Sequence, residues 1–476
     1  MITIHSVTAD GAFNTRLWDN KSCNFFTEDG EKIDVDVSLS EEEIKAMDKA
    51  KAEAEESCRN RDAAASNERG DNLAEHEASA RECYSRSKYS LTQATKSKNL
   101  CTIKIQMGLA CNFTCQYCKQ TAHKSLDPHA NLEDARRFIE KFPVFCTTDR
   151  KEPIRIELWG GEPLVYWETL QLLGEYFRNE FPNARITVLS NGSLVTKEKI
   201  DWFIKHKIVL AVSHDGPGQL DYRSGDPLAD GSDTLEALRY YADNASEPLY
   251  FNAVITKGRY DLPGIITFIK SKFSDPAKVQ VGFEGIVLIE DEAQFDAKTM
   301  FTQEDYLELR REIVGHLVNG RINEVSVMKH KVQSMMQFIT SDKFHLDDNI
   351  QQKCSMDSPF NVSVSLKGDV LACHSTPRVI GTIDNFEEAN LGVIGFTHWH
   401  SRPECLSCPV LPICRGGCLA QDAVAFYHTC NNEFQYHMIF FETVFQLLFG
   451  EAIIAMEGIQ RPTKEIFIER YKELAA

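Results

Sequence analysis

Three cysteines, Cys111, Cys115 and Cys118, follow one another at C-x-x-x-C-x-x-C spacing, directly after a strand-like run over residues 101–107. Three thiolates at this spacing can bind three irons of a 4Fe-4S cube and leave the fourth iron without a protein ligand. An iron without a protein ligand is available to take part in a reaction. Tyr117, beside the last cysteine, could pack against a flat ligand over the cluster. The spacing therefore predicts an iron–sulfur site with an open coordination position.

Seven more cysteines crowd into residues 354–430. Thirteen residues separate Cys354 from Gly368, and four separate Gly368 from the next cysteine. The seven cysteines are sufficient for two further clusters, or nearly so. A zinc site is the alternative for either group of cysteines. For the first group, His123 does not complete a familiar zinc knuckle, and for the second a four-ligand ribbon would leave three cysteines unused. In order, the seven are Cys354, Cys373, Cys405, Cys408, Cys414, Cys418 and Cys430.

The remaining composition narrows the class of protein. Fifteen cysteines in a cytosolic chain of 476 residues would be unusual as disulfides, and the five scattered ones are expected to be ordinary thiols. The formal net charge of −18, without a Lys/Arg-rich block, disfavours a nucleic-acid partner. Neither a signal-peptide pattern nor an apolar run of transmembrane length is present, so a cytoplasmic protein without a membrane partner is expected.

Polar residues follow three strand-like runs further along the chain. Gly160, Gly161 and Glu162 come after the second such run, where two glycines let the backbone approach a ligand and a carboxylate follows at once. Asn191 follows the third run, and Ser213 and Asp215 lie at the end of the fourth. Asn252, on the fifth, is a weaker candidate. Each could instead stabilise a turn through its side chain.

Together, the cysteine loop and the Gly160–Pro163 segment resemble the cluster loop and the GGEP motif of the radical S-adenosylmethionine (SAM) superfamily. This resemblance implies that the open iron binds the amino and carboxylate groups of SAM. The reduced cluster then cleaves SAM to a 5′-deoxyadenosyl radical. It also implies that the SAM ammonium group contacts the segment of Gly160, Gly161 and Glu162. By the same resemblance, Asn191, Ser213 and Asp215 would contact the ribose or the carboxylate of SAM.

The later cysteines match the SPASM pattern of radical SAM peptide maturases without a missing member. The resemblance implies that one auxiliary cluster binds Cys405, Cys408, Cys414 and Cys430, and that the other binds Cys354, Cys373 and Cys418. Residues 345–353 contain no eighth cysteine, which predicts an open iron or a non-cysteine ligand on the second auxiliary cluster. SAM and three [4Fe-4S] clusters are therefore the expected cofactors.

The resemblance covers about residues 99–430 and implies a maturase of ribosomally made peptides. The deoxyadenosyl radical would take a hydrogen from a precursor peptide, and a C–C, ether or thioether crosslink would close between side chains. A flavodoxin or ferredoxin would supply electrons. Sulfatase-maturase-like oxidation of a Cys or Ser is a second hypothesis, although His374 stands where those enzymes have an aspartate base. His374 could itself act as a base or be structural. An iron–sulfur electron-transfer protein is a third hypothesis, but it would not need the GGEP motif.

The elements that must position these residues alternate along residues 99 to about 320. Six strand-like runs are separated by helix-like runs, which predicts parallel βα units and a partial (β/α)6 barrel, with its active site at the carboxyl ends of the strands. The expected strands are 101–107, 154–158, 185–189, 208–213, 249–255 and 279–286. The expected helices are 131–142, 166–180, 196–206, 232–243, 261–272 and 303–318.

The flanking regions are expected to differ from this α/β part. Residues 1–95 carry short strands, with a hairpin around Glu28-Asp29-Gly30 and a polar helix from Ser40, and would bind a leader peptide or decorate the barrel. The cysteine-rich region is expected to be held by metal ligation rather than by an apolar core. The predicted domains are 1–95, a barrel at 96–320, a helical linker at 321–350, a SPASM domain at 351–435 and C-terminal helices at 436–476. A buried apolar helix is expected at 431–449 and a final helix at 463–474.

Overall fold

A computed structural model gives the fold of the chain. It describes residues 1–20, 22–35, 95–120, 130–286, 300–320, 326–340, 354, 356, 358–375, 378–390, 405–418 and 423–459. The predicted helices from Ser40 and at 463–474 lie outside these residues. None of the helices in the described part of the chain is long and apolar enough to span a membrane.

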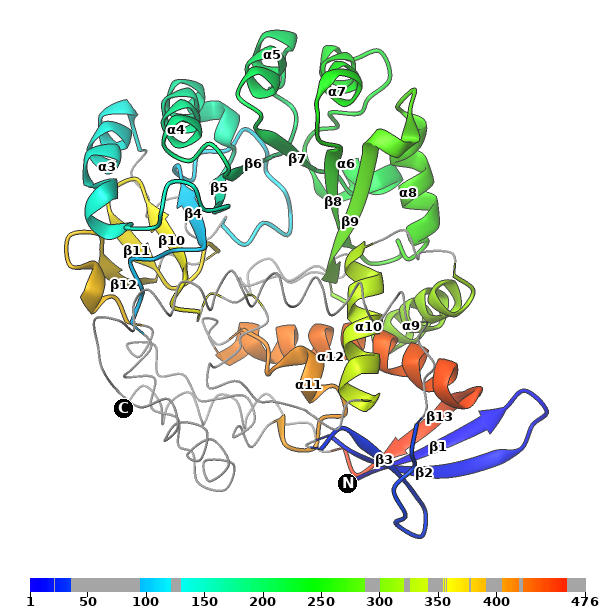
Figure 1. The fold of residues 1–476 in the computed structure, drawn as a ribbon. Coiled ribbons are helices and arrows are strands. Elements are labelled where there is room, and N and C mark those ends of the chain that lie inside the picture. The colour runs from blue at the N-terminus through cyan, green and yellow to red at the C-terminus, as the bar shows by residue number, and fades with distance from the viewer. Residues whose placement is uncertain are drawn as a thin grey trace.

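The centre of the molecule is a curved sheet whose six parallel strands follow one another in chain order (Figure 1). Burial alternates most clearly in the third strand, where Ile186, Val188 and Ser190 are covered while the residues between them are only partly so. The predicted strands are confirmed to within a residue or two. They are β4 (Thr102–Gln106), β5 (Arg155–Trp159), β6 (Arg185–Ser190), β7 (Val209–Ser213), β8 (Leu249–Ile255) and β9 (Val279–Ile286).

Helices lie along the outer side of this curved sheet (Figure 1). Several begin at a side chain that caps the backbone, such as Asn131, Thr196 and Ser232, which fixes where each helix starts. Phe138, Phe142 and Leu173 are among the apolar side chains that the helices bury in the core. The prediction of an α/β fold with a parallel sheet is confirmed. These helices are α3 (Leu132–Phe145), α4 (Trp167–Glu180), α5 (Lys197–Lys205), α6 (Gln219–Tyr222), α7 (Asp233–Asn244) and α8 (Leu262–Ser271). Two more, α9 (Gln303–Val318) and α10 (Ser326–Thr340), follow the last parallel strand and pack against the later helix at 423–449.

Part of the cysteine-rich region extends the same sheet, which corrects the prediction that no apolar core holds it. Strand β10 (Asn361–Ser365) pairs in parallel with β4, and β11 (Asp369–Leu371) and β12 (Val379–Thr382) continue the sheet in antiparallel fashion. Val362, Val364 and Val370 are fully buried in the main core. The strands were missed because they are only three to five residues long. Gly368 makes the β10–β11 turn at a φ of 95°.

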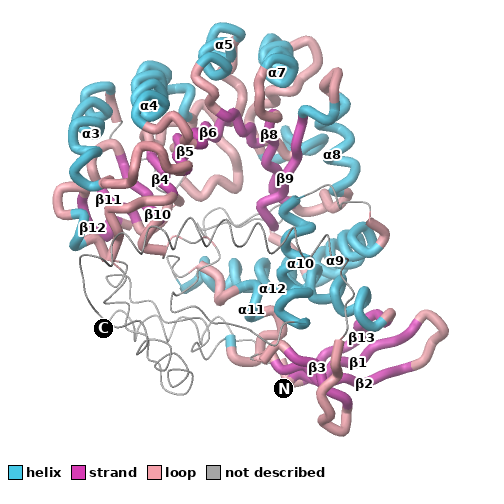
Figure 2. Tube along the Cα trace, viewed as in Figure 1, coloured by secondary structure: helices cyan, strands magenta, loops and turns pink. Residues whose placement is uncertain are grey.

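Strands from the N-terminal region and from residues 451–457 form a second sheet together (Figure 2). Strand β1 (Ile2–Thr8) pairs with β2 (Phe13–Asp19) on one side and with β13 (Glu451–Glu457) on the other, and β3 (Asn24–Thr27) pairs with β2. Within the region 436–476, which was predicted to contain the C-terminal helices, residues 451–457 form a strand. The buried carboxylate of Glu451 accepts hydrogen bonds from Ser6, Asn14 and Arg16, a set of partners that no local pattern reveals.

One long helix, α12 (Ala423–Phe449), packs against this second sheet and extends the helix predicted at 431–449. Trp18 and Phe25 contact Phe441 of this helix through their aromatic rings. The turn predicted at Glu28-Asp29-Gly30 is also present, because the Thr27 amide donates to the Glu31 carbonyl at 2.8 Å. The second sheet thus packs its buried side chains against α12.

Candidate active site

The cysteine loop leaves the carboxyl end of β4 and is anchored on the loop that follows β7. The Gln116 amide donates to the Tyr222 carbonyl at 2.8 Å, and the Thr114 amide donates to the Ser224 hydroxyl at 2.9 Å. Cys111, Cys115 and Cys118 are all partly buried. These contacts hold the three cysteines at the edge of the sheet where the parallel strands end.

Gly160 and Gly161 let two loops cross closely at the end of β5. The Gly161 amide donates to the Gly108 carbonyl, and the Glu162 amide donates to the Ala110 carbonyl, both at 2.9 Å. A Cβ on either glycine would come within 3.0 Å of backbone carbonyl oxygens of the cysteine loop. In this structure the glycines therefore bring the segment before Glu162 against the segment before Cys111.

The Glu162 side chain is fully buried and joins the ends of β5 and β6. Its carboxylate accepts hydrogen bonds from the Ser190 hydroxyl at 2.7 Å, from the Asn191 amide at 2.6 Å and from the Leu164 amide at 3.0 Å. Burial raises the pKa of Glu162, and these donors oppose that rise. The carboxylate fixes the backbone of Asn191.

Asn191 reaches from β6 to the cysteine loop. Its side-chain NH₂ lies 3.9 Å from the Cys111 sulfur and donates to Asn112 Oδ1 at 2.9 Å. Its own Oδ1 accepts from the amide and the hydroxyl of Ser193. Because hydrogen bonds to cysteine sulfurs influence the reduction potential of an iron–sulfur cluster, this amide is positioned to affect both geometry and redox behaviour.

Asp215 forms a buried cluster with Tyr117 and Arg223. Its carboxylate accepts from the Tyr117 hydroxyl, from Arg223 Nε at 2.8 Å and from the Val254 amide at 3.2 Å. The guanidinium of Arg223 also lies over the Tyr117 ring, 5.3 Å from its centroid. Burial raises the pKa of Tyr117 well above its usual value, so its hydroxyl stays a donor. The contacts among Asp215, Tyr117 and Arg223 connect the cysteine loop to β7 and β8.

The predicted residues thus gather at one edge of the sheet, from the ends of β4, β5, β6 and β7. Ser213 lies at the end of β7, partly buried and paired in register with Asn252 of β8. Arg223 was missed because it lies in an irregular loop with no motif of its own. Ser190 belongs to the same short motif as Asn191 and could have been found from it.

His374 lies against Trp159, with the two ring centroids 4.6 Å apart. Burial lowers the pKa of His374 to about 3, and the positive charges of Lys104 and Lys119 add to that effect. A group with this pKa is a weak proton acceptor near neutral pH, which counts against a role as general base.

Four of the seven later cysteines lie on or against α12 and the N-terminal sheet. Cys405, Cys408 and Cys414 belong to one short segment that ends in helix α11 (Leu411–Cys414), and Cys430 lies within α12. The N-terminal strands hold this segment. Trp18 Nε1 donates to the Pro409 carbonyl at 3.1 Å, and Asn20 donates to the Cys408 carbonyl at 2.7 Å. Residues 1–20 therefore help to position a cysteine-rich loop.

The other three cysteines are distributed differently. Cys373 follows β11, partly buried, and its sulfur accepts a hydrogen bond from the Ser375 amide at 3.3 Å. Cys354 is exposed, and Cys418 lies a few residues after α11.

Comparison with known proteins gives a consistent picture. Residues 105–261 match the model of the radical SAM superfamily. The chain is 21% identical over 338 residues to the radical SAM cyclopropyl synthase TigE of Paramaledivibacter caminithermalis, and the match covers 67% of each chain. It is 28% identical over 144 residues to a serine-type anaerobic sulfatase-maturating enzyme of Bacteroides thetaiotaomicron, which is 28% of this chain and 34% of that one.

Among solved structures, anSMEcpe with bound AdoMet shares the fold. Its TM-score is 0.53 at 17% sequence identity, and the match covers 73% of this chain and 98% of that one. The parallel sheet, the cysteine loop at its edge and the matched superfamily model agree, and residues 105–261 form a radical SAM domain.

Proposed function

We propose that this protein is a radical SAM peptide maturase that introduces a crosslink between side chains of a ribosomally made precursor peptide. The observation that carries the proposal is the convergence of the cysteine loop with Glu162, Asn191 and Asp215 at the carboxyl edge of the sheet. A scaffold or electron carrier would not need buried hydrogen bonds from three other strands to orient such a loop.

In this proposal Cys111, Cys115 and Cys118 hold the cluster that binds SAM. When bound, the cluster and SAM supply a 5′-deoxyadenosyl radical. Gly160 and Gly161 present backbone groups beside the cysteine loop, and Glu162 holds Asn191 against Cys111. Ser213 and Asp215, at the end of β7, are the remaining residues of the proposed SAM site. Asp215 would act indirectly, through its contacts with Tyr117 and Arg223.

Two auxiliary clusters are part of the same proposal. Cys405, Cys408, Cys414 and Cys430 would hold one, which is supported by the packing of the 405–414 segment near α12. Cys354, Cys373 and Cys418 would hold the other, with one iron open or bound by another kind of ligand. Crosslinking removes two hydrogens, one as an atom and one as a proton with an electron, and an auxiliary cluster would accept that electron.

A peptide substrate is supported by the relatives. TigE is named as a cyclopropyl synthase, and closing a cyclopropyl ring requires a carbon–carbon bond. The structure of anSMEcpe has also been solved with AdoMet and the Kp18Cys peptide. A flavodoxin or ferredoxin in the cytoplasm would reduce the SAM cluster. Oxidation of a Cys or Ser is the second candidate, favoured by the stretch shared with the sulfatase-maturating enzyme.

The test is an anaerobic assay with SAM, dithionite and the reconstituted protein, in which 5′-deoxyadenosine is measured. Wild type should form it, Cys115→Ala should not, and Cys146→Ala, which changes a buried cysteine outside the loop, should behave as wild type. Absence of deoxyadenosine from wild type would refute the proposal. With a precursor peptide, a product lighter by two hydrogens and resistant to hydrazine-type carbonyl reagents indicates a crosslink, whereas a carbonyl product indicates the second candidate.

A further inference from the structure

Helix α12 carries an acid–imidazole pair beside one of the expected cluster ligands. Cys430, Glu433 and His437 are spaced three and four residues apart, which places them along one face of the helix. His437 is fully buried and Glu433 is 8% exposed. His437 Nε2 lies 3.0 Å from Glu433 Oε2, so the two side chains form a buried pair.

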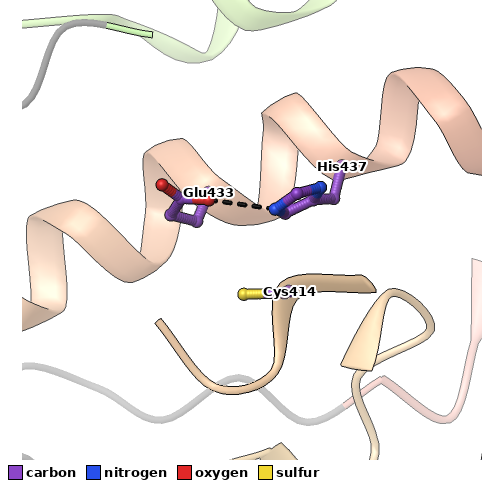
Figure 3. A group of neighbouring side chains, drawn as sticks. All are labelled: Cys414, Glu433 and His437. Atoms are coloured by element: carbon purple, nitrogen blue, oxygen red, sulfur yellow. Dashed lines mark ion pairs between the residues drawn. The ribbon is translucent and has the colours of Figure 1, made fainter. Parts of the chain in front are cut away.

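The Cys414 side chain points toward this pair from helix α11 (Figure 3). One ligand atom from each of Cys414, Glu433 and His437 lies within 4.8 Å of the others. The three groups come from two segments, α11 and α12, whose packing is also supported by Trp18 and Asn20. The pair therefore lies next to a sulfur that the proposed function assigns to an auxiliary cluster.

Two considerations place the pair outside the ligand set. A 4Fe-4S cube takes one protein ligand on each iron, and Cys405, Cys408, Cys414 and Cys430 already supply four. In addition, His437 Nε2 and Glu433 Oε2 form an ion pair at 3.0 Å, so each group already has the other as its charge partner. Groups that hydrogen-bond around metal ligands tune the metal site without binding it.

We propose that Glu433 and His437 set the reduction potential of the auxiliary cluster bound through Cys414. The inference rests on the proposed function, because it needs that cluster to be present. The Glu433 carboxylate brings negative charge near an anionic cluster and disfavours reduction, and His437 offsets that charge by pairing with it. They are positioning and tuning residues, since neither contacts substrate or SAM in this account.

Replacing the two members of the pair should shift the reduction potential in opposite directions. Glu433→Gln removes the negative charge and should raise the potential of one auxiliary cluster. His437→Gln leaves the carboxylate without its imidazole and should lower it. At a fixed poise the ratio of reduced to oxidised cluster should change about tenfold or more in each direction, where tenfold corresponds to about 59 mV for one electron. Loss of packing alone would not give opposite shifts.

The matched control is Glu442→Gln on the same helix. Glu442 is also a largely buried carboxylate, but it pairs with Arg310 of α9 rather than with groups beside Cys414. This variant should leave all three potentials unchanged. The potentials are measured by redox titration of the reconstituted full chain, followed by electron paramagnetic resonance, after iron has been counted in every preparation.

A second measurement needs no variant. In wild type with ¹⁵N-labelled histidine, pulsed electron paramagnetic resonance of the reduced protein should detect a weak histidine-nitrogen coupling at one auxiliary cluster. No coupling at any cluster, or a strong coupling from direct ligation, would overturn the inference. So would a Glu433→Gln protein with unchanged potentials. If wild type lacks auxiliary clusters altogether, the proposed function fails first, and the iron count reveals which of the two has failed.

Discussion

Replacing Asp215 with asparagine should loosen the cysteine loop, because Asp215 is the common partner of Tyr117 and Arg223. The side chains of Asp215 and Arg223 are only 2% and 9% exposed. Asparagine keeps the size of the side chain but removes its charge, which leaves the guanidinium buried without its counter-charge. Removing one partner of a buried ion pair typically costs about 3–5 kcal/mol.

That cost should appear as local opening around the loop. Because about 1.4 kcal/mol corresponds to a factor of ten, protection of backbone amides against hydrogen exchange should fall roughly 100- to 1,000-fold or more. The amides to follow are those of Gln116, bonded to Tyr222, and of Val254, bonded to Asp215. Hydrogen-exchange mass spectrometry on the reconstituted protein would report peptides covering 111–120 and 249–257.

The control is Glu247→Gln, which breaks the pair between Arg185 and Glu247. These two side chains are 46% and 45% exposed and lie 3.1 Å apart, so the loss should be about 1 kcal/mol or less. It should leave exchange in the cysteine loop unchanged. If Asp215→Asn also leaves the loop as protected as in wild type, the cluster around Asp215 does not hold the loop and the reasoning is wrong.

Two further predictions concern the backbone crossing and the second sheet. Gly161→Ala should reduce both SAM binding and the stability of the fold, because its Cβ would clash with backbone oxygens, among them that of Ala110. The control is Gly315→Ala in helix α9, where nothing lies within 4 Å of a Cβ. This variant should instead stabilise the protein by about 0.5–1 kcal/mol in a thermal melt. Glu451 should contribute stability that is present above pH 5 and lost in acid. Burial raises the pKa of Glu451, but the hydrogen bonds from Arg16 and from two other side chains have the larger effect and lower that pKa below its usual value. Urea unfolding from pH 7 to pH 3 should show this loss in wild type and a smaller one in Glu451→Gln, and equal pH dependence in the two proteins would contradict it.

The parallel sheet was predictable because its strands have alternating or continuous apolar residues and are separated by helix-like runs. Strands β10 to β12 were not, because three to five residues are too few for a reliable periodic pattern, and β10 is buried through its pairing with β4, far away in sequence. Strand β13 was missed for a related reason. It pairs with β1 from the opposite end of the chain, and its buried Glu451 is explained only by Arg16 and its neighbours.

The candidate site likewise contains residues that were predictable from the sequence and residues that were not. Glu162 and Asn191 were found from motifs at strand ends, and the structure brings both to the cysteine loop. Arg223 and the Glu433–His437 pair were not found, since each matters through neighbours that only the fold supplies. His374 was singled out by its place beside Cys373, but its environment lowers its pKa in a way that the sequence does not reveal.

The central claim is a SAM-binding cluster on Cys111, Cys115 and Cys118 with two auxiliary clusters elsewhere, and an iron count tests it most directly. The protein is reconstituted anaerobically with iron and sulfide, in wild type and in the variant with all three cysteines replaced by alanine. The account predicts about twelve irons in wild type and about eight in the variant. Zinc in place of iron, or equal iron in both proteins, would contradict it.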